Sequence, residues 1–327
     1  MLEFTTIEGL VLAVGAMITG IILLMKGGDW TIESAVFVAK RWGVSPLVVG
    51  FTIIAFGTSL PELIVSVLAN IQGSPGIAIG NVLGSNIANI LLVIGSAAIF
   101  TTLAAGSKGM TRDLVMMMAS TVLLLFLLQQ GEVGRLAGLA MLLALVMYVL
   151  WQYRAAGKGD EPPPDTEDPA FKSQLVAYGF LFAGLICIAL GAEFLVRGAK
   201  VSAHVIGVPE AVIALSIIAF GTSLPELSTS IIASRKGHSD IVLGNIIGSN
   251  VFNILMIIGV TALVKPIQQG SFAPQLAQFD IWLVLAVSLI FALLLVFYKK
   301  INRPIGLAFC GGYIAYNIYI YAIYMGS

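Results

Sequence analysis

Two glutamates, Glu62 and Glu226, occupy the same place in two identical stretches, FGTSLPEL, and each stretch lies within a long apolar segment. If such a segment spans a membrane, an ionised carboxylate at its centre costs roughly 2.5–3.5 kcal/mol, so it should face the protein interior. The proline before each glutamate, Pro61 or Pro225, removes a helical hydrogen bond and frees a carbonyl group. Carboxylate, hydroxyl and carbonyl oxygens gathered at one point predict a cage for a cation.

A second duplicated motif, GSNIAN and later GSNVFN, follows each glutamate. Ser85 and Asn89 are four residues apart, as are Ser249 and Asn253, so each pair should share one face of a helix. Their hydroxyl and amide oxygens are hard ligands, which suit calcium or sodium rather than zinc or copper. Magnesium is disfavoured because it sheds its water reluctantly. Both motifs therefore point to a site for hard cations.

The elements that carry these residues are predicted to be membrane-spanning helices. The chain has 327 residues, of which 58% are hydrophobic and 10% are charged, whereas soluble domains carry about 25% charged residues. Several apolar runs reach the ~20 residues that a spanning helix needs. We therefore expect an all-α polytopic membrane protein with ten transmembrane helices. The predicted spans are 7–40, 46–72, 75–100, 112–129, 133–152, 173–206, 210–235, 240–264, 279–298 and 304–324.

A hydrophilic segment, residues 153–172, divides the chain into two halves. It contains three consecutive prolines and a cluster of acids, and it cannot bury enough apolar surface to fold. We interpret it as a linker. Residues 1–152 and 173–327 are then expected to form one five-helix unit each.

Lys and Arg residues are distributed unevenly between the two sides of the predicted bundle. All but four of the 17 lie in the connections on one side, which the positive-inside rule makes cytoplasmic, so both termini should lie outside. The formal net charge of zero indicates no nucleic-acid partner. The predicted spans contain no nucleophile–base pair or zinc motif, so we do not expect an enzyme.

The two halves are related by a gapless offset of 164 residues. Residues 50–95 match residues 214–259 at 25 of 46 positions, including Thr, Ser, Pro, Glu and Asn at fixed places. Embedded glycine pairs, Gly80/Gly84 and Gly244/Gly248, are typical of close helix packing. Because each half holds an odd number of predicted spans, the second half should enter the membrane from the opposite side. Inverted repeats of this kind are characteristic of secondary transporters, which bind substrate near the membrane midplane where the repeats meet.

AFGTSLPEL and GNVLGSNIANI, with their second copies, closely resemble the two α-repeats of the cation/calcium exchanger superfamily, with the prokaryotic sodium/calcium exchangers nearest. The resemblance covers both halves and places four motif blocks in the family's order. It implies a ten-helix antiporter that exchanges sodium for calcium by alternating access. Calcium and sodium are then transported ions, and no cofactor is expected. We expect a monomer, integral to the lipid bilayer of a prokaryotic inner membrane.

The resemblance also implies a cation site where the two repeats meet. Glu62 and Glu226 would bind calcium and sodium in turn. Several prokaryotic relatives and the potassium-dependent exchangers carry Asp in place of Asn253, and an amide cannot ionise, which argues against potassium co-transport. The oxygens that would complete the site belong to Thr58, Ser59, Thr222, Ser223, Ala55, Ala219, Ser85, Asn89, Ser249 and Asn253.

A mechanism follows from the charges. Two carboxylates in a poor dielectric repel each other, so the empty site should resist crossing the membrane, and cations that neutralise the carboxylates should permit the switch. The long first and sixth helices lie outside the ligand motifs and are expected to slide as a gate.

Two alternatives remain open at this point. A calcium/proton antiporter of the same superfamily would use the same glutamates, with protons competing for them. A passive cation channel would conduct without counter-transport.

Overall fold

The computed structural model describes residues 7–107, 109–156, 171, 173–205, 221, 223–268 and 272–325. The chain folds as an all-α polytopic membrane protein. Of the described helices, seven are long and apolar enough to cross a membrane, or eight if one bent pair counts as a single span. The total of ten stays a prediction, because part of the predicted span 210–235 lies outside the described residues.

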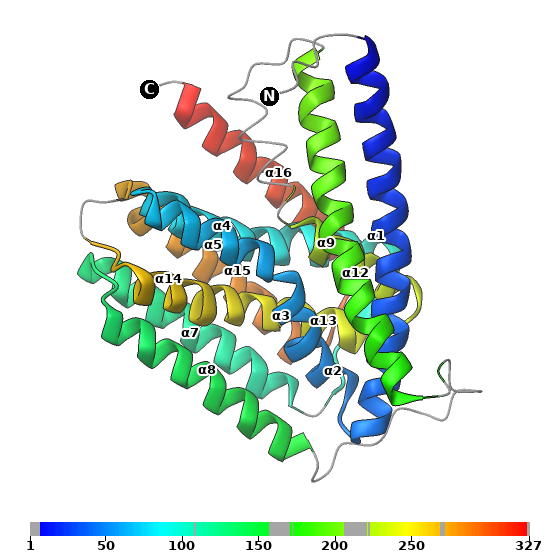
Figure 1. Cartoon of the computed structure of the whole chain (residues 1–327). Coiled ribbons are helices and arrows are strands. Elements are labelled where there is room, and N and C mark those ends of the chain that lie inside the picture. The colour runs from blue at the N-terminus through cyan, green and yellow to red at the C-terminus, as the bar shows by residue number, and fades with distance from the viewer. Residues whose placement is uncertain are drawn as a thin grey trace.

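Two long helices, α1 (Ile7–Trp42) and α9 (Gln174–Val205), run side by side along one edge of the molecule (Figure 1). Glycines bring their backbones together: a Cβ on Gly20 would lie 2.7 Å from the carbonyl oxygen of Gly191, and one on Gly27 would lie 2.7 Å from that of Gly184. As the chain advances along α1 it meets α9 in reverse order, so the two helices are antiparallel. Small residues permit such close packing between helices in a membrane.

The next helix is broken at the first FGTSLPEL motif. Ser59 leaves the helical conformation with φ −84° and ψ 0°, and the axis bends by 43°. Pro61 lacks an N–H and favours a helix start, so it both ends one piece and begins the next. At the second motif, α12 (Leu224–Arg235) likewise begins after Ser223, with φ −89° and ψ 3°. The pieces around the first break are α2 (Pro46–Val49), the π-helical turn η1 (Gly50–Ile54), α3 (Ala55–Thr58) and α4 (Leu60–Ile71).

Two helices with an internal π-helical segment form the centre of the fold. Their bounds, like those of α4 and α12, recur at an offset of 164 residues, so the duplicated sequence folds twice into the same local structure. The second is deeply buried, with 89% of its most apolar stretch inside the protein. The first comprises α5 (Pro75–Ala88), η2 (Asn89–Ile94) and α6 (Gly95–Phe100), and the second comprises α13 (Ser239–Phe252), η4 (Asn253–Ile258) and α14 (Gly259–Val264).

Short strand contacts join the two halves at the ends of these central helices. β1 (Leu103–Ala104), which follows α6, pairs antiparallel with β2 (Lys300–Ile301) of the second half. Ile267, which follows α14, pairs with Val133 of the first half. Each half therefore holds the other at an equivalent place. The remaining helices are α7 (Met110–Gln130), α8 (Arg135–Ala156), η5 (Leu276–Asp280), α15 (Ile281–Leu293), η6 (Leu294–Tyr298) and α16 (Arg303–Met325).

The predicted linker 153–172 lies mostly outside the described residues. At its start, α8 continues to Ala156. Near its end, Phe171 is buried, with its ring centroid 5.8 Å from that of Phe37 and 5.5 Å from that of Phe180. The boundaries of the two five-helix units stay a prediction.

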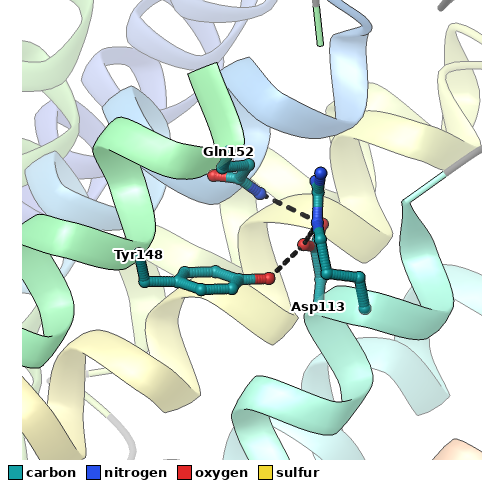
Figure 2. Close-up of polar contacts among 4 residues, drawn as sticks. Asp113, Tyr148 and Gln152 are labelled. Atoms are coloured by element: carbon teal, nitrogen blue, oxygen red, sulfur yellow. Dashed lines mark hydrogen bonds and ion pairs between the residues drawn. The ribbon is translucent and has the colours of Figure 1, made fainter. Parts of the chain in front are cut away.

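Two buried aspartates outside the duplicated motifs join pairs of neighbouring helices. Asp113 of α7 accepts hydrogen bonds from the Tyr148 hydroxyl and, at 3.1 Å, from the Gln152 amide, both on α8 (Figure 2). In the second half, the Tyr316 hydroxyl of α16 donates to Asp280 at 3.2 Å. Sequence analysis singled out neither aspartate. Their hydrogen-bonded partners explain how these carboxylates can be buried.

The contact between α1 and α9 predicts a position-dependent effect on stability. Gly20→Leu places a side chain against Gly191 and should lower the apparent melting temperature of the detergent-solubilised protein by several degrees, because overpacking costs about 1–3 kcal/mol. Gly15→Leu on the same helix is the matched control, since nothing lies within 4 Å of its Cβ position. Equal melting temperatures for the two variants would contradict the contact.

Candidate cation site

The helix breaks and the π-helical segments meet at the centre of the protein. α4 packs against α5 and against η4 of the other half, while α12 packs against α13 and against η2 of the first half. Each FGTSLPEL motif therefore faces its own GSN motif and the one from the other half. This arrangement brings predicted site residues from both halves to one place.

Glu62 and Glu226 lie in the first turns of α4 and α12, and each is 1% exposed. Their charges are close enough to interact across the boundary between the halves. Thr58 of the first half lies beside the Glu226 carboxylate. The N-terminus of a helix favours a negative charge, so each helix break stabilises the charge that its apolar surroundings disfavour. A buried pair of this kind attracts a cation.

Several buried oxygen atoms at this centre have no hydrogen-bond partner among the described residues. Leaving such a group unpaired costs about 1–3 kcal/mol, so their concentration in one place indicates a site built for a ligand. A hard cation is the ligand that accepts only oxygen lone pairs. The atoms are Glu62 Oε2, both carboxylate oxygens of Glu226, the Oγ atoms of Ser59, Ser223 and Ser249, and the Oδ1 atoms of Asn89 and Asn253. Ser85 is also buried.

Two further predicted ligands, Ala55 and Thr58, belong to α3. The Thr58 hydroxyl donates to a carbonyl of its own helix at 3.1 Å, which leaves the lone pairs of its oxygen for another partner. The Ala55 carbonyl accepts from the Ser59 N–H at 3.1 Å and keeps a second lone pair. The equivalent residues of the second half, Ala219 and Thr222, lie outside the described residues.

Two asparagines that sequence analysis did not single out, Asn86 and Asn250, contact the predicted amide ligands. Asn89 Nδ2 donates to Asn250 Oδ1 at 3.0 Å, and Asn253 Nδ2 donates to Asn86 Oδ1 at 3.0 Å. The two hydrogen bonds are equivalent under the 164-residue offset, and each crosses between the halves. All four side chains are 1% exposed. The signal was present in the sequence, because both residues belong to the repeated GSN motif.

A second pair of amides, Asn81 and Asn245, was also missed. Asn81 Nδ2 donates to Ser66 Oγ at 2.9 Å and to the backbone carbonyl of Glu62 at 3.2 Å. Asn245 Nδ2 donates to Thr229 Oγ1 at 3.3 Å. These amides tie α5 to α4 and α13 to α12 next to the glutamates, and thereby hold the first turns that carry the carboxylates.

The site combines two carboxylates with neutral oxygens. Within the described part of the chain, no group of three or more His, Cys, Asp or Glu side chains is placed to hold a metal ion. A cation at this centre must therefore use hydroxyl, amide and carbonyl oxygens as well. Calcium takes about 6–8 oxygen ligands of these kinds, and one calcium ion balances the charges of Glu62 and Glu226.

Comparison with known proteins gives consistent matches along the whole chain. The sequence matches the family described as sodium/calcium exchanger protein over residues 12–154 and 176–322. It is 34% identical to the inner membrane protein YrbG of Escherichia coli over 322 residues, which cover 95% of this chain and 98% of the relative. It is 31% identical to the sodium/calcium exchanger MaX1 of Methanosarcina acetivorans over 345 residues, which cover 94% and 98%.

The fold is similar to that of a solved structure, the sodium/calcium exchanger from Methanococcus jannaschii. The TM-score is 0.81 at 31% sequence identity, and the match covers 94% of this chain and 97% of that chain. The likeness therefore includes both halves and the central motifs.

We expect the purified protein to bind calcium and to lose this binding when either glutamate is neutralised. Calcium at 100 times its dissociation constant should stabilise the unchanged protein by about 2.7 kcal/mol and raise its melting temperature. Glu62→Gln or Glu226→Gln removes half of the site's charge and should abolish the rise. Asp113→Asn, a change to a buried carboxylate on α7, is the control and should keep it. A full calcium-dependent rise in either Gln variant would show that the site lies elsewhere.

Proposed function

Because the chain belongs to the prokaryotic sodium/calcium exchangers of the cation/calcium exchanger superfamily, we propose that it exchanges sodium for calcium across the membrane by alternating access. The observation that carries this proposal is the pair of buried glutamates, one from each half, with unpartnered oxygens around them in the described residues. The relative from Methanosarcina acetivorans and the solved structure carry this activity in their names.

The proposed architecture is two inverted repeats of five transmembrane helices each, residues 1–152 and 173–327, with both termini outside. The recurrence of helix bounds at 164 residues and the antiparallel packing of α1 on α9 support it. In such an arrangement the two glutamates are related by a pseudo-two-fold axis in the membrane plane. The substrate site then lies on that axis, where one set of motifs can open to either side.

The proposed role of the two glutamates is to make translocation depend on ion loading. An empty site carries two negative charges in a dry interior, and moving it towards the other side keeps that repulsion. One calcium ion, or sodium ions in its place, neutralises the pair and removes the barrier. Three sodium ions would leave one positive charge, so exchange at that family ratio would be electrogenic.

A calcium/proton antiporter is the alternative, and it would use the same centre. Protons and cations would then compete for Glu62 and Glu226. The unpartnered amide and hydroxyl oxygens favour sodium as the coupling ion, because a proton on a carboxylate needs no cage of further oxygens.

Calcium uptake into proteoliposomes tests the coupling ion. Vesicles loaded with sodium and diluted into sodium-free buffer should accumulate radioactive calcium, whereas vesicles loaded with potassium or choline should not. A pH gradient is imposed in a parallel set. Uptake driven by the pH gradient and independent of sodium would replace sodium by protons, and uptake that needs neither gradient would favour a passive channel.

The proposed gate is the pair α1 and α9, which slides against the rest of the bundle. In the described state α1 packs against α12, where Lys236 Nζ lies 2.8 Å from Asp29 Oδ1 and 2.9 Å from Glu33 Oε1. Burial and the Lys236 charge lower the pKa of His238, so Lys236 is the cation that faces these carboxylates at neutral pH. Sliding of α1 must break or stretch this contact.

A disulfide between α1 and α12 should stop exchange. A Cβ on Gly28 would lie 3.7 Å from Ile232 Cβ, within the 3.5–4.5 Å range of disulfides. The pair Gly28→Cys and Ile232→Cys is introduced after Cys187 and Cys310, both free, are changed to Ala. Oxidation should abolish sodium-driven calcium uptake and reduction should restore it, while each single-cysteine variant stays active in both conditions. Full uptake by the oxidised pair would exclude sliding of α1 at this contact.

A further inference from the structure

The two predicted amide ligands pose a problem of orientation. The side-chain amide of Asn89 or Asn253 has an oxygen end and an NH2 end of almost equal size. Only the oxygen end can contact a cation, because the NH2 end carries hydrogen atoms with partial positive charge. A site that relies on such amides must therefore distinguish their two ends.

Groups from the opposite half make this distinction. Asn253 Nδ2 donates to Asn86 Oδ1, and Asn89 Nδ2 donates to Asn250 Oδ1, both at 3.0 Å. The oxygen ends of Asn89 and Asn253 are buried and have no hydrogen-bond partner among the described residues. Each nitrogen end is therefore engaged away from the free oxygen.

The partner amides are oriented in turn by groups that only accept hydrogen bonds. Asn86 Nδ2 donates to the backbone carbonyl of Asn250 at 3.3 Å. Asn250 Nδ2 lies 3.9 Å from the thioether sulfur of Met117 on α7. Because neither acceptor can donate, the nitrogen ends of Asn86 and Asn250 face them, and the oxygen ends face Asn253 and Asn89.

From these contacts we infer that Asn86 and Asn250 are positioning residues that make Asn253 and Asn89 present oxygen to the transported cation. The inference deepens the proposed function and rests on it. Neither positioning residue needs to touch the ion. Its effect passes through one hydrogen bond to the other half, so each repeat orients a ligand of its counterpart.

The backbone explains why residues three apart take different roles. Asn89 and Asn253 are the first residues of the π-helical segments η2 and η4, whereas Asn86 and Asn250 still belong to α5 and α13. A π-helical segment changes the register of the helix, and such segments often occur at functional sites. Here the register changes between the residue that positions and the residue that binds.

The inference predicts that the need for Asn86 depends on the chemistry at position 253. A carboxylate has oxygen at both ends and needs no partner to select one. Asn86→Ala should therefore raise the calcium dissociation constant of the detergent-purified protein about 10–100-fold, but change it little when Asn253→Asp is also present. Isothermal titration with calcium chloride measures the four constants directly.

Asn250→Ala is the matched control. Asn250 orients Asn89, which Asn253→Asp leaves unchanged, so Asn250→Ala should weaken calcium binding by a similar factor with either residue at position 253. Rescue by Asn253→Asp should thus be specific to Asn86. A purely structural role for Asn86 predicts no such selectivity.

The remaining outcomes overturn the inference. Calcium binding by Asn86→Ala as tight as that of the unchanged protein does so, and so does an equal loss of binding with and without Asn253→Asp. If Asn86→Ala fails to fold, judged by its melting curve without calcium, Asn86→Leu keeps the volume without the acceptor and takes its place. Absence of calcium binding in the unchanged protein would instead overturn the proposed function, and the inference with it.

Discussion

The rest of the structure depends on keeping two carboxylates, Glu62 and Glu226, inside an apolar bundle. Burying an ion costs several kcal/mol even after relaxation, whereas the start of a helix returns about 0.3–1 kcal/mol, or up to ~2 in partly buried geometries. The helix breaks therefore offset part of the cost and cannot offset all of it. The remainder must come from a bound cation, and the ring of buried oxygens without partners in the described residues is what such a cation requires.

A dry site of this kind requires helices that pack without gaps across the boundary between the halves. Gly244 and Gly248 of α13 supply this contact, since a Cβ on either would lie 2.3 Å from a backbone carbonyl oxygen, that of Leu47 or of Phe51. The glycine pair in the second half was expected to mediate close packing, and this is confirmed. Because α13 touches α2 and η1 backbone to backbone, its serine and asparagine side chains are held against the first helix break.

The extent of sequence prediction follows from the range of each interaction. Glu62 could be found from the sequence because a charge in an apolar segment is costly wherever the segment lies. The helix break followed from Pro61, a local signal. Asn86 and Asn250 could not be assigned, because their partners lie in the other half and depend on how α5 crosses α13. The π-helical register change at Asn89, which separates it from Asn86, also leaves no mark in the residue spacing.

The two halves share a symmetric site but differ at the gate, and the size of that difference bounds its effect. Lys236 contacts Asp29 and Glu33 on α1, whereas the equivalent positions are Gln72 in α4's C-cap and Glu193 and Arg197 on α9, which pair with each other. Partly exposed ion pairs contribute about 0–1 kcal/mol, so each biases the two end states by at most about fivefold. The repulsion of two uncompensated buried carboxylates is larger. Ion loading at the centre, and not the contact at the gate, must therefore control the switch.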